Sequence, residues 1–207
     1  MANNGNLYII AAPSGAGKTT LVKALALTLS SLTISISHTT RAMRQGEVDG
    51  SSYYFIDKAQ FERMIEQGDF LEHATIFGNL YGTSKRWVDT TLASGTDIIL
   101  EIDWQGHRQI KQLFPESIGI FILPPSLNDL RDRLVNRNQD HADIIEKRLA
   151  DVRVAVSHAK EFEYLVINDT LEHALHELQV IVEAGRLSQA RQAAKFAPLL
   201  SELTKPL

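Results

Sequence analysis

Short apolar runs alternate along the chain with longer segments in which apolar residues recur every three or four positions. The runs predict strands over residues 6–12, 97–103, 118–123 and 164–167. The periodic segments predict helices over residues 17–30, 105–113, 126–134, 145–159 and 171–200, the last partly interrupted by Gly185. Apolar strands that alternate with helices are typical of an α/β protein whose parallel sheet is buried on both faces.

A different pattern lies between the first two of these units. Residues 32–37 alternate apolar and hydroxyl side chains and predict a short strand whose tip is Ser37. Residues 38–50 are polar without periodicity, which predicts a loop. Further elements follow: strands over 51–56, 70–77 and 80–83, a helix capped by Asp57 and ended by Gly68, and a helix from Ser84 to near Gly95. We therefore expect residues 38–83 to form a small mixed insertion.

The stretch from Ala11 to Thr20 (AAPSGAGKTT) joins the first predicted strand to the first predicted helix. A helix start has unpaired backbone N–H groups and a partial positive charge, and glycines let the preceding backbone curl around a polyphosphate. Lys18 adds a positive charge for the outer phosphates, and the Thr19 hydroxyl can ligate Mg²⁺. The stretch therefore predicts a phosphate-binding loop for a nucleoside triphosphate.

Ala12 stands where the pattern G-x-x-x-x-G-K-[ST] has its first glycine. An alanine is tolerated there if its φ stays negative. The alternative is a glycine-rich turn before an ordinary helix, which is disfavoured because the strand, the lysine, the threonine and the helix are all in place.

Composition narrows the class of protein. The chain has 207 residues and no cysteine, which excludes disulfides and thiolate metal sites and fits a reducing compartment such as the cytoplasm. We expect no signal peptide, because the first residues lack a basic region followed by an apolar one. No apolar run approaches the ~18 residues that span a membrane. A net charge of −4 argues against a protein that coats nucleic acid. The sequence does not indicate an oligomeric state.

Polar residues follow several predicted strands. Because ligands bind at the carboxyl ends of parallel strands, we expect Ser37, Glu101, Asp103, Asn168 and Asp169 to lie near the phosphate-binding loop. Period-two alternation places Glu101 and Asp103 on one side of their strand. One of them could hold the water shell of Mg²⁺ while the other meets a second substrate. The alternative is a pair of solvated carboxylates.

Two arginine groups suit anionic ligands. Arg41 and Arg44 lie three residues apart in a glycine-containing loop and match the oxygens of an acceptor phosphate. Arg137 and Arg148 belong to a basic group around a break in the helical pattern near residues 136–142. A lid with arginines would cover the charge of a transferring phosphoryl group. The alternative for both groups is ordinary solvated surface charge.

With these residues in place, the chain resembles the guanylate kinase family nearly end to end. The resemblance rests on seven segments in the family's order and spacing. They are residues 12–19 (APSGAGKT), 37–41 (SHTTR), 46–53 (GEVDGSSY), 70–72 (FLE), 78–83 (GNLYGT), 102–106 (IDWQG) and 166–169 (VIND).

The resemblance implies a P-loop nucleoside-monophosphate-kinase fold, with a parallel sheet flanked by helices, a mixed GMP-binding insertion at residues 38–83 and a helical lid near 126–155. The core would then be residues 1–37, 84–125 and 156–207. The implied reaction converts ATP and GMP, or dGMP, to ADP and GDP (or dGDP) with Mg²⁺, in the cytoplasm and without nucleic-acid or membrane partners.

The resemblance also assigns roles to residues. Ser37, Glu72 and Thr83 would read guanine, since a carboxylate accepts from N1–H and the 2-amino group, which adenine does not offer together. The other GMP contacts would be Arg41, Arg44, Tyr53, Tyr81, Gly82 and Asp103. The ATP contacts would be Ala12, Pro13, Ser14, Gly15, Ala16, Gly17, Lys18, Thr19, Thr20, Asn168 and Asp169. Catalysis is assigned to Lys18, Arg44, Arg137 and Arg148, and Mg²⁺ to Thr19 and, through water, Glu101.

Besides Ala12, two positions depart from the family's pattern. Glu101 stands where the family commonly has aspartate, and Thr83 where serine is also found. Two other functions compete. Guanylate-kinase-like domains of membrane-associated scaffolds bind phosphorylated proteins, but they usually lose the phosphate-binding loop. A kinase of the same fold acts on a phosphorylated sugar, but the guanine-reading set around Glu72 argues against that substrate.

Overall fold

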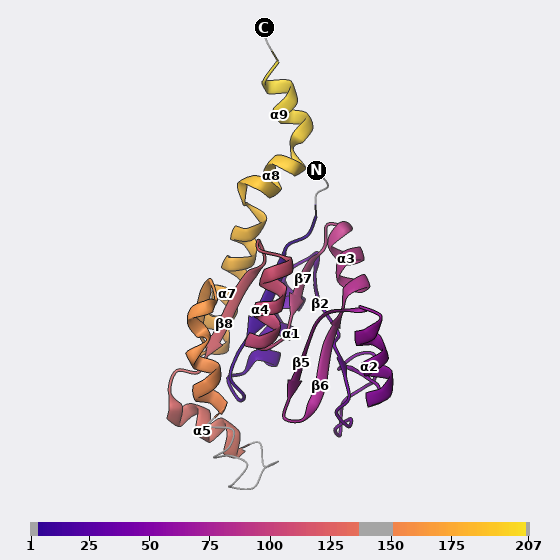
Figure 1. Cartoon of the computed structure of the whole chain (residues 1–207). Helices are drawn as coiled ribbons and strands as arrows, with labels where there is room; N and C mark the ends of the chain where they lie inside the picture. The colour runs from indigo at the N-terminus through magenta and orange to yellow at the C-terminus, as the bar shows by residue number, and fades with distance from the viewer. Residues whose placement is uncertain (1–3, 137–150, 206–207) are drawn as a thin grey trace.

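The computed structural model describes residues 4–136 and 151–205 (Figure 1). Their main element is a five-stranded sheet with the order β2-β7-β1-β8-β9. All four neighbouring pairs are parallel. The strands are β1 (Leu7–Ala11), β2 (Leu32–Ile34), β7 (Asp97–Leu100), β8 (Ile118–Leu123) and β9 (Tyr164–Ile167). This arrangement confirms the α/β fold predicted from the apolar runs.

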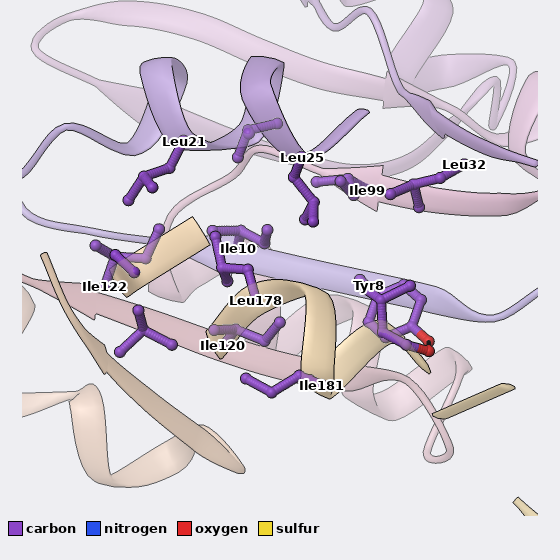
Figure 2. Packing of buried hydrophobic residues seen from close by; sticks show 14 of the residues in the cluster. Tyr8, Ile10, Leu21, Leu25, Leu32, Ile99, Ile120, Ile122, Leu178 and Ile181 are labelled. Carbon is purple, nitrogen blue, oxygen red and sulfur yellow. Dashed lines mark hydrogen bonds between the residues drawn. The ribbon is translucent and has the colours of Figure 1, made fainter. Parts of the chain in front are cut away.

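Helices cover both faces of this sheet because its central strands are apolar on both sides. Tyr8 and Ile10 of β1 pack against α1 (Lys18–Thr28) and α7 (Leu171–Arg186), as Figure 2 shows. Leu7 and Ile9 point to the opposite face, where α3 (Lys85–Ala93) and α4 (Trp104–Leu113) lie. Side chains alternate across a strand, so one apolar run supplies two cores.

The second sheet is mixed and has the order β4-β3-β6-β5. Its strands are β3 (His38–Thr39), β4 (Tyr54–Phe55), β5 (Phe70–Ile76) and β6 (Asn79–Ser84). Helix α2 (Lys58–Glu66) begins after Asp57, whose carboxylate accepts a hydrogen bond from the Gln60 N–H at 2.7 Å. The cap is the one the sequence predicted. Ser84 likewise accepts from the Trp87 N–H and starts α3.

The other described helices lie in the second half of the chain. Ser126 accepts a hydrogen bond from the Asp129 N–H at 3.0 Å and starts α5 (Leu127–Asn136). Residues 151–157 are helical and lead into the 3₁₀ helix η1 (Ala159–Glu161). Helices α8 (Gln189–Lys195) and α9 (Ala197–Leu203) extend away from the body of the molecule (Figure 1). Within the described ranges, no helix is long and apolar enough to cross a membrane.

Several predicted strand bounds were wrong. Residues 38–50 were expected to be a loop, but His38 and Thr39 form β3 between β4 and β6. Two residues are too few for a periodicity, and their conformation depends on pairing with distant strands. The strand over 97–103 ends at Leu100, and that over 51–56 is reduced to Tyr54 and Phe55. Likewise β2 ends at Ile34, three residues before Ser37.

Gly185 does not interrupt the C-terminal helix, so that expectation was wrong as well. Helix α7 continues through it to Arg186, and the break between α7 and α8 falls at Leu187 and Ser188. A Cβ at Gly185 would lie 2.4 Å from the Tyr8 hydroxyl oxygen. The glycine therefore serves close packing of α7 on β1 and not termination of the helix.

Asp97 ties the C-terminal helices to the sheet. It is fully buried and accepts from the guanidinium groups of Arg186 at 2.7 Å and Arg191 at 2.5 Å. It also accepts from the Asn6 N–H. We expect Asp97→Ala to lower the free energy of unfolding by about 2–3 kcal/mol, because two arginines and one N–H lose a buried partner. Urea denaturation measures the change, with the exposed Asp89→Ala as control. Equal stability of the two variants would contradict this account.

Candidate functional site

A cavity of about 890 Å³ lies between the two sheets, at the carboxyl ends of the parallel strands. One end is lined by the phosphate-binding loop and by residues 101–103, which follow β7. The other end is lined by the loop over residues 41–53 and by β5 and β6 of the mixed sheet. The cavity therefore joins a phosphate-binding end to a second end built by the insertion.

The phosphate-binding loop has the backbone that its glycines predict. Gly15 and Gly17 have φ values of 89° and 90°, where side chains are rarely tolerated. Among the described residues, Ser31 and Phe77 alone combine a positive φ with a side chain, so Ala12 keeps the negative φ that makes it acceptable. The Asn168 amide donates to the Ala16 carbonyl at 2.7 Å and braces the loop from behind.

Lys18 and Thr19 lie close to the carboxylates of Glu101 and Asp103 beside this loop. The Thr19 hydroxyl donates to the Glu101 carboxylate at 2.5 Å. The Lys18 ammonium lies 3.4 Å from the Ile102 carbonyl oxygen. Burial lowers the pKa of Lys18, and the nearby charges of Glu101 and Asp103 partly oppose that shift. An anion bound at this end of the cavity would raise the pKa of Lys18 again and favour the charged lysine.

Glu101 and Asp103 both line the cavity, but not for the reason that the sequence suggested. Period-two alternation requires a strand, and β7 ends before either residue. Asp103 instead caps α4, accepting from the N–H groups of Gln105 and Gly106 at 3.0 Å each. Glu101 points to Thr19. Glu101 and Asp103 therefore line the cavity from the short segment that joins β7 to α4.

At the arginine end of the cavity, Arg41 is paired with a glutamate to which the sequence analysis gave no role. Arg41 pairs with Glu47 at 2.7 Å, and the second oxygen of Glu47 accepts from the Arg44 N–H at 2.8 Å. The Arg41 guanidinium also lies 5.4 Å from the centre of the Tyr53 ring. The Glu47 carboxylate thus takes the kind of contact that a phosphate would make. A six-residue spacing in a loop offers no pattern from which this pairing could be predicted.

Glu72 is a buried carboxylate in the wall of the cavity. Its exposed fraction is 3%, and its Oε1 accepts from the Thr83 hydroxyl at 2.6 Å. Burial raises the pKa of Glu72 to about 7, with a smaller contribution from Asp103, while the Thr83 hydrogen bond opposes the shift. A buried carboxyl group whose pKa is raised to about 7, in the wall of a polar cavity, is typical of a ligand-recognition site.

The predicted site residues are only partly brought together. Those that line the cavity are Ala12 to Thr19, Ser37, Arg41, Arg44, Tyr53, Glu72, Tyr81, Glu101 and Asp103. Those that lie outside its lining are Thr20, Gly82, Thr83, Asn168 and Asp169. Thr83 reaches the cavity only through Glu72. Arg137 and Arg148 lie outside the described residues.

Comparison with known proteins places the chain in a family. The family model described as guanylate kinase matches residues 4–185. The chain belongs to the guanylate kinase family. It is 57% identical to the guanylate kinase of Alcanivorax borkumensis and 53% identical to that of Coxiella burnetii, in each case over 98% of both chains. The crystal structure of guanylate kinase from Anaplasma phagocytophilum matches with a TM-score of 0.77 and 30% identity, over 91% of this chain and 89% of that one.

Three predictions are thereby confirmed: the family, the P-loop kinase fold and the assignment as an ATP:GMP phosphotransferase. The reading as a non-catalytic protein-binding module is not favoured. The intact phosphate-binding loop agrees with this outcome, because the glycine conformations, Lys18 and Thr19 are all in place.

The buried Glu72 carboxylate has a consequence for the stability of this guanylate kinase. Because its pKa is raised to about 7 in the folded protein, the folded state keeps a proton that the unfolded chain releases above its ordinary pKa. The contribution of Glu72 to stability therefore falls between about pH 4.5 and 7 and levels off above. We expect Glu72→Gln to raise the free energy of unfolding by about 2 kcal/mol at pH 8.

Chemical denaturation at pH 4.5 and pH 8 measures this difference, which should be small at the lower pH. The matched control is Glu66→Gln, which makes the same change on the exposed surface of α2. Destabilisation by Glu72→Gln at pH 8 would contradict a costly buried charge.

Proposed function

We propose that the enzyme transfers the γ-phosphoryl group of ATP directly to the phosphate of GMP or dGMP, with Mg²⁺, by in-line displacement. The observation that carries this proposal is a single cavity with a phosphate-binding loop at one end and the buried Glu72 carboxylate at the other. ATP phosphates fit the loop, and a guanine base fits the carboxylate. The acceptor and donor phosphates then meet in between.

On the donor side, the backbone N–H groups at the start of α1 cradle the ATP phosphates. Lys18 places its ammonium between the phosphates that separate, where negative charge grows in the transition state. The braced loop keeps these donors fixed, since Asn168 holds the Ala16 carbonyl from behind. Asn168 is thereby assigned to the ATP side through the loop that it supports.

Thr19 and Glu101 are the residues that would hold Mg²⁺. A hydroxyl and a carboxylate already in contact are oxygen donors of the kind that Mg²⁺ prefers, with phosphates and water as the other ligands. Bound Mg²⁺ supplies charge neutralisation of the β- and γ-phosphate oxygens. The described residues hold no cluster of three or more histidine, cysteine or acidic side chains that would suit a metal without a nucleotide.

On the acceptor side, Arg41, Arg44, Tyr53 and Tyr81 bind the GMP phosphate. Their arrangement in one wall of the cavity supports this role. The Arg41 guanidinium now pairs with Glu47, so a bound phosphate would share or take over this contact. Because the phosphate is already an anionic nucleophile, no strong general base is required.

We further propose that residues 38–83 are the GMP-binding unit and that the region near 126–155 is the lid, with Arg137 and Arg148 on the transferring phosphoryl group. The mixed sheet, built from residues 38–84, supports the first assignment. We also propose a cytoplasmic location, consistent with the absence of cysteine.

The test is a coupled assay of ADP release with GMP, dGMP, AMP, UMP and sugar phosphates as acceptors. We expect turnover with GMP and dGMP and little with the others. We also expect Glu72→Ala to raise KM for GMP at least tenfold and leave KM for ATP within twofold, because only the guanine edge loses its acceptor. Equal changes in both constants would remove Glu72 from the guanine site.

Lys18→Ala should act mainly on kcat, with a loss of about 10²–10³-fold, because the ammonium stabilises charge that develops in the transition state. Steady-state kinetics with both substrates varied measures the effect. The exposed Lys58→Ala on α2 is the control for loss of a positive charge. A Lys18→Ala enzyme with unchanged kcat would refute the role.

A further inference from the structure

Helix α4 begins against the Glu72 carboxylate. At Gly106, in the first turn of α4, an added Cβ would lie 2.7 Å from Glu72 Oε2 and 2.9 Å from Ile102 Cδ1. Non-bonded heavy atoms attract at about 3.5–4.0 Å, so a side chain at this position would have to displace the ends of the Glu72 and Ile102 side chains. Gly106 lies inside a helix and does not have a positive φ. Its glycine is therefore explained by the space that Glu72 occupies.

The first turn of α4 cannot retreat from Glu72. Asp103 caps the helix and holds the Gly106 N–H itself at 3.0 Å. The Gln105 side chain also donates to Asp103 at 3.0 Å. One turn further along, Ile110 is fully buried in the core. The start of α4 is thus fixed to the turn that follows β7.

Strand β5 is fixed to α4 in the same way. The Gln109 side chain accepts from the His73 N–H at 3.2 Å and donates to the His73 carbonyl at 2.8 Å. His73 directly follows Glu72, so this pair of hydrogen bonds sets the distance between the Glu72 backbone and the helix. Thr83 then holds the other carboxylate oxygen at 2.6 Å. The carboxylate therefore lies between Thr83 on one side and the first turn of α4 on the other.

We propose that Gly106 is a positioning residue for recognition of the base of the acceptor nucleotide. Because Gly106 has no side chain, it leaves the space that the Glu72 carboxylate occupies. Any other residue at this position would displace that carboxylate. The inference rests on the proposed role of Glu72 in guanine recognition. Such a carboxylate must meet N1–H and the 2-amino group together, and hydrogen bonds weaken steeply when donor and acceptor are misaligned.

Gly106→Ala tests this role by its selectivity between substrates. We expect KM for GMP to rise at least fivefold while KM for ATP stays within twofold. We also expect the preference for GMP over inosine monophosphate, which lacks the 2-amino group, to fall at least threefold in kcat/KM. A change in general stability would not alter that preference. Unchanged GMP constants in a folded Gly106→Ala enzyme would overturn the proposal.

The matched control is Gly185→Ala on α7, which like Gly106 lies inside a helix. There an added Cβ would be at least as crowded, 2.4 Å from the Tyr8 hydroxyl oxygen, but the contact lies in the core and not in the cavity or on α4. Both variants should lose stability, and only Gly106→Ala should change the preference among acceptors. A loss of preference of the same size in both variants would show that crowding alone is responsible, and would overturn the proposal.

A double variant identifies Glu72 as the group that Gly106 positions. Glu72→Asp shortens the side chain and moves its carboxylate away from α4. Gly106→Ala should then have less than twofold effect on KM for GMP in the Glu72→Asp background, while independent effects that multiply would overturn the proposal.

If Gly106→Ala alone fails to fold, recovery of folding in the double variant supports the same contact, and failure to recover it counts against it. Absence of GMP turnover in the unmodified enzyme would instead refute the proposed function, which keeps the two outcomes separate.

Discussion

The buried parallel sheet is the constraint on which the rest of this guanylate kinase depends. Its central strands are apolar on both faces, so helices must cover both, and between parallel strands the chain has to return from the carboxyl end of one strand to the amino end of the next. Every crossover leaves a loop at the carboxyl edge. The phosphate-binding loop, the turn with Glu101 and Asp103, and Asn168 all lie in such loops. The position of the site therefore follows from the connections between the strands and the helices that cover the sheet.

Two groups in the cavity that would bind ligands are already in contact with carboxylates. Arg41 is held by Glu47 and the Thr19 hydroxyl by Glu101, so phosphate and metal would replace existing contacts and not fill empty ones. This arrangement limits the penalty of gathering cations in one place before a substrate arrives. The affinity for a ligand then depends on the difference between the contacts that the ligand makes and the similar contacts that it replaces. A difference of this kind suits an enzyme that must release its products.

The sequence predicted those features that depend on local patterns. Apolar runs identified most strands of the parallel sheet. Asp57 was correctly predicted as a helix cap and helices were correctly predicted to start at Ser84 and Ser126, because a helix start needs only neighbouring residues. What depends on distant residues was missed. The strand β3 requires partners on both sides, and the glycine in α7 responds to a tyrosine far away in the chain.

The same distinction holds for the candidate site. Glu72 could be assigned from a resemblance, but its burial, its bond to Thr83 and its crowding by Gly106 arise only when β5, β6 and α4 come together. The raised pKa of Glu72 follows from that assembly and not from any neighbour in sequence.

A buried carboxylate destabilises the protein without substrate but suits recognition. In water, Glu72 would exchange readily between partners. Buried in the wall of the cavity it has few, so a base that offers two donors is strongly preferred over one that does not. Specificity of this kind depends on the rigidity of the wall, because a mobile carboxylate could turn to meet other bases. The cap at Asp103, the Gln109 bonds to β5 and the missing side chain at Gly106 each remove one way for the carboxylate to move. The unfavourable burial and the fixed geometry are thus two aspects of one arrangement.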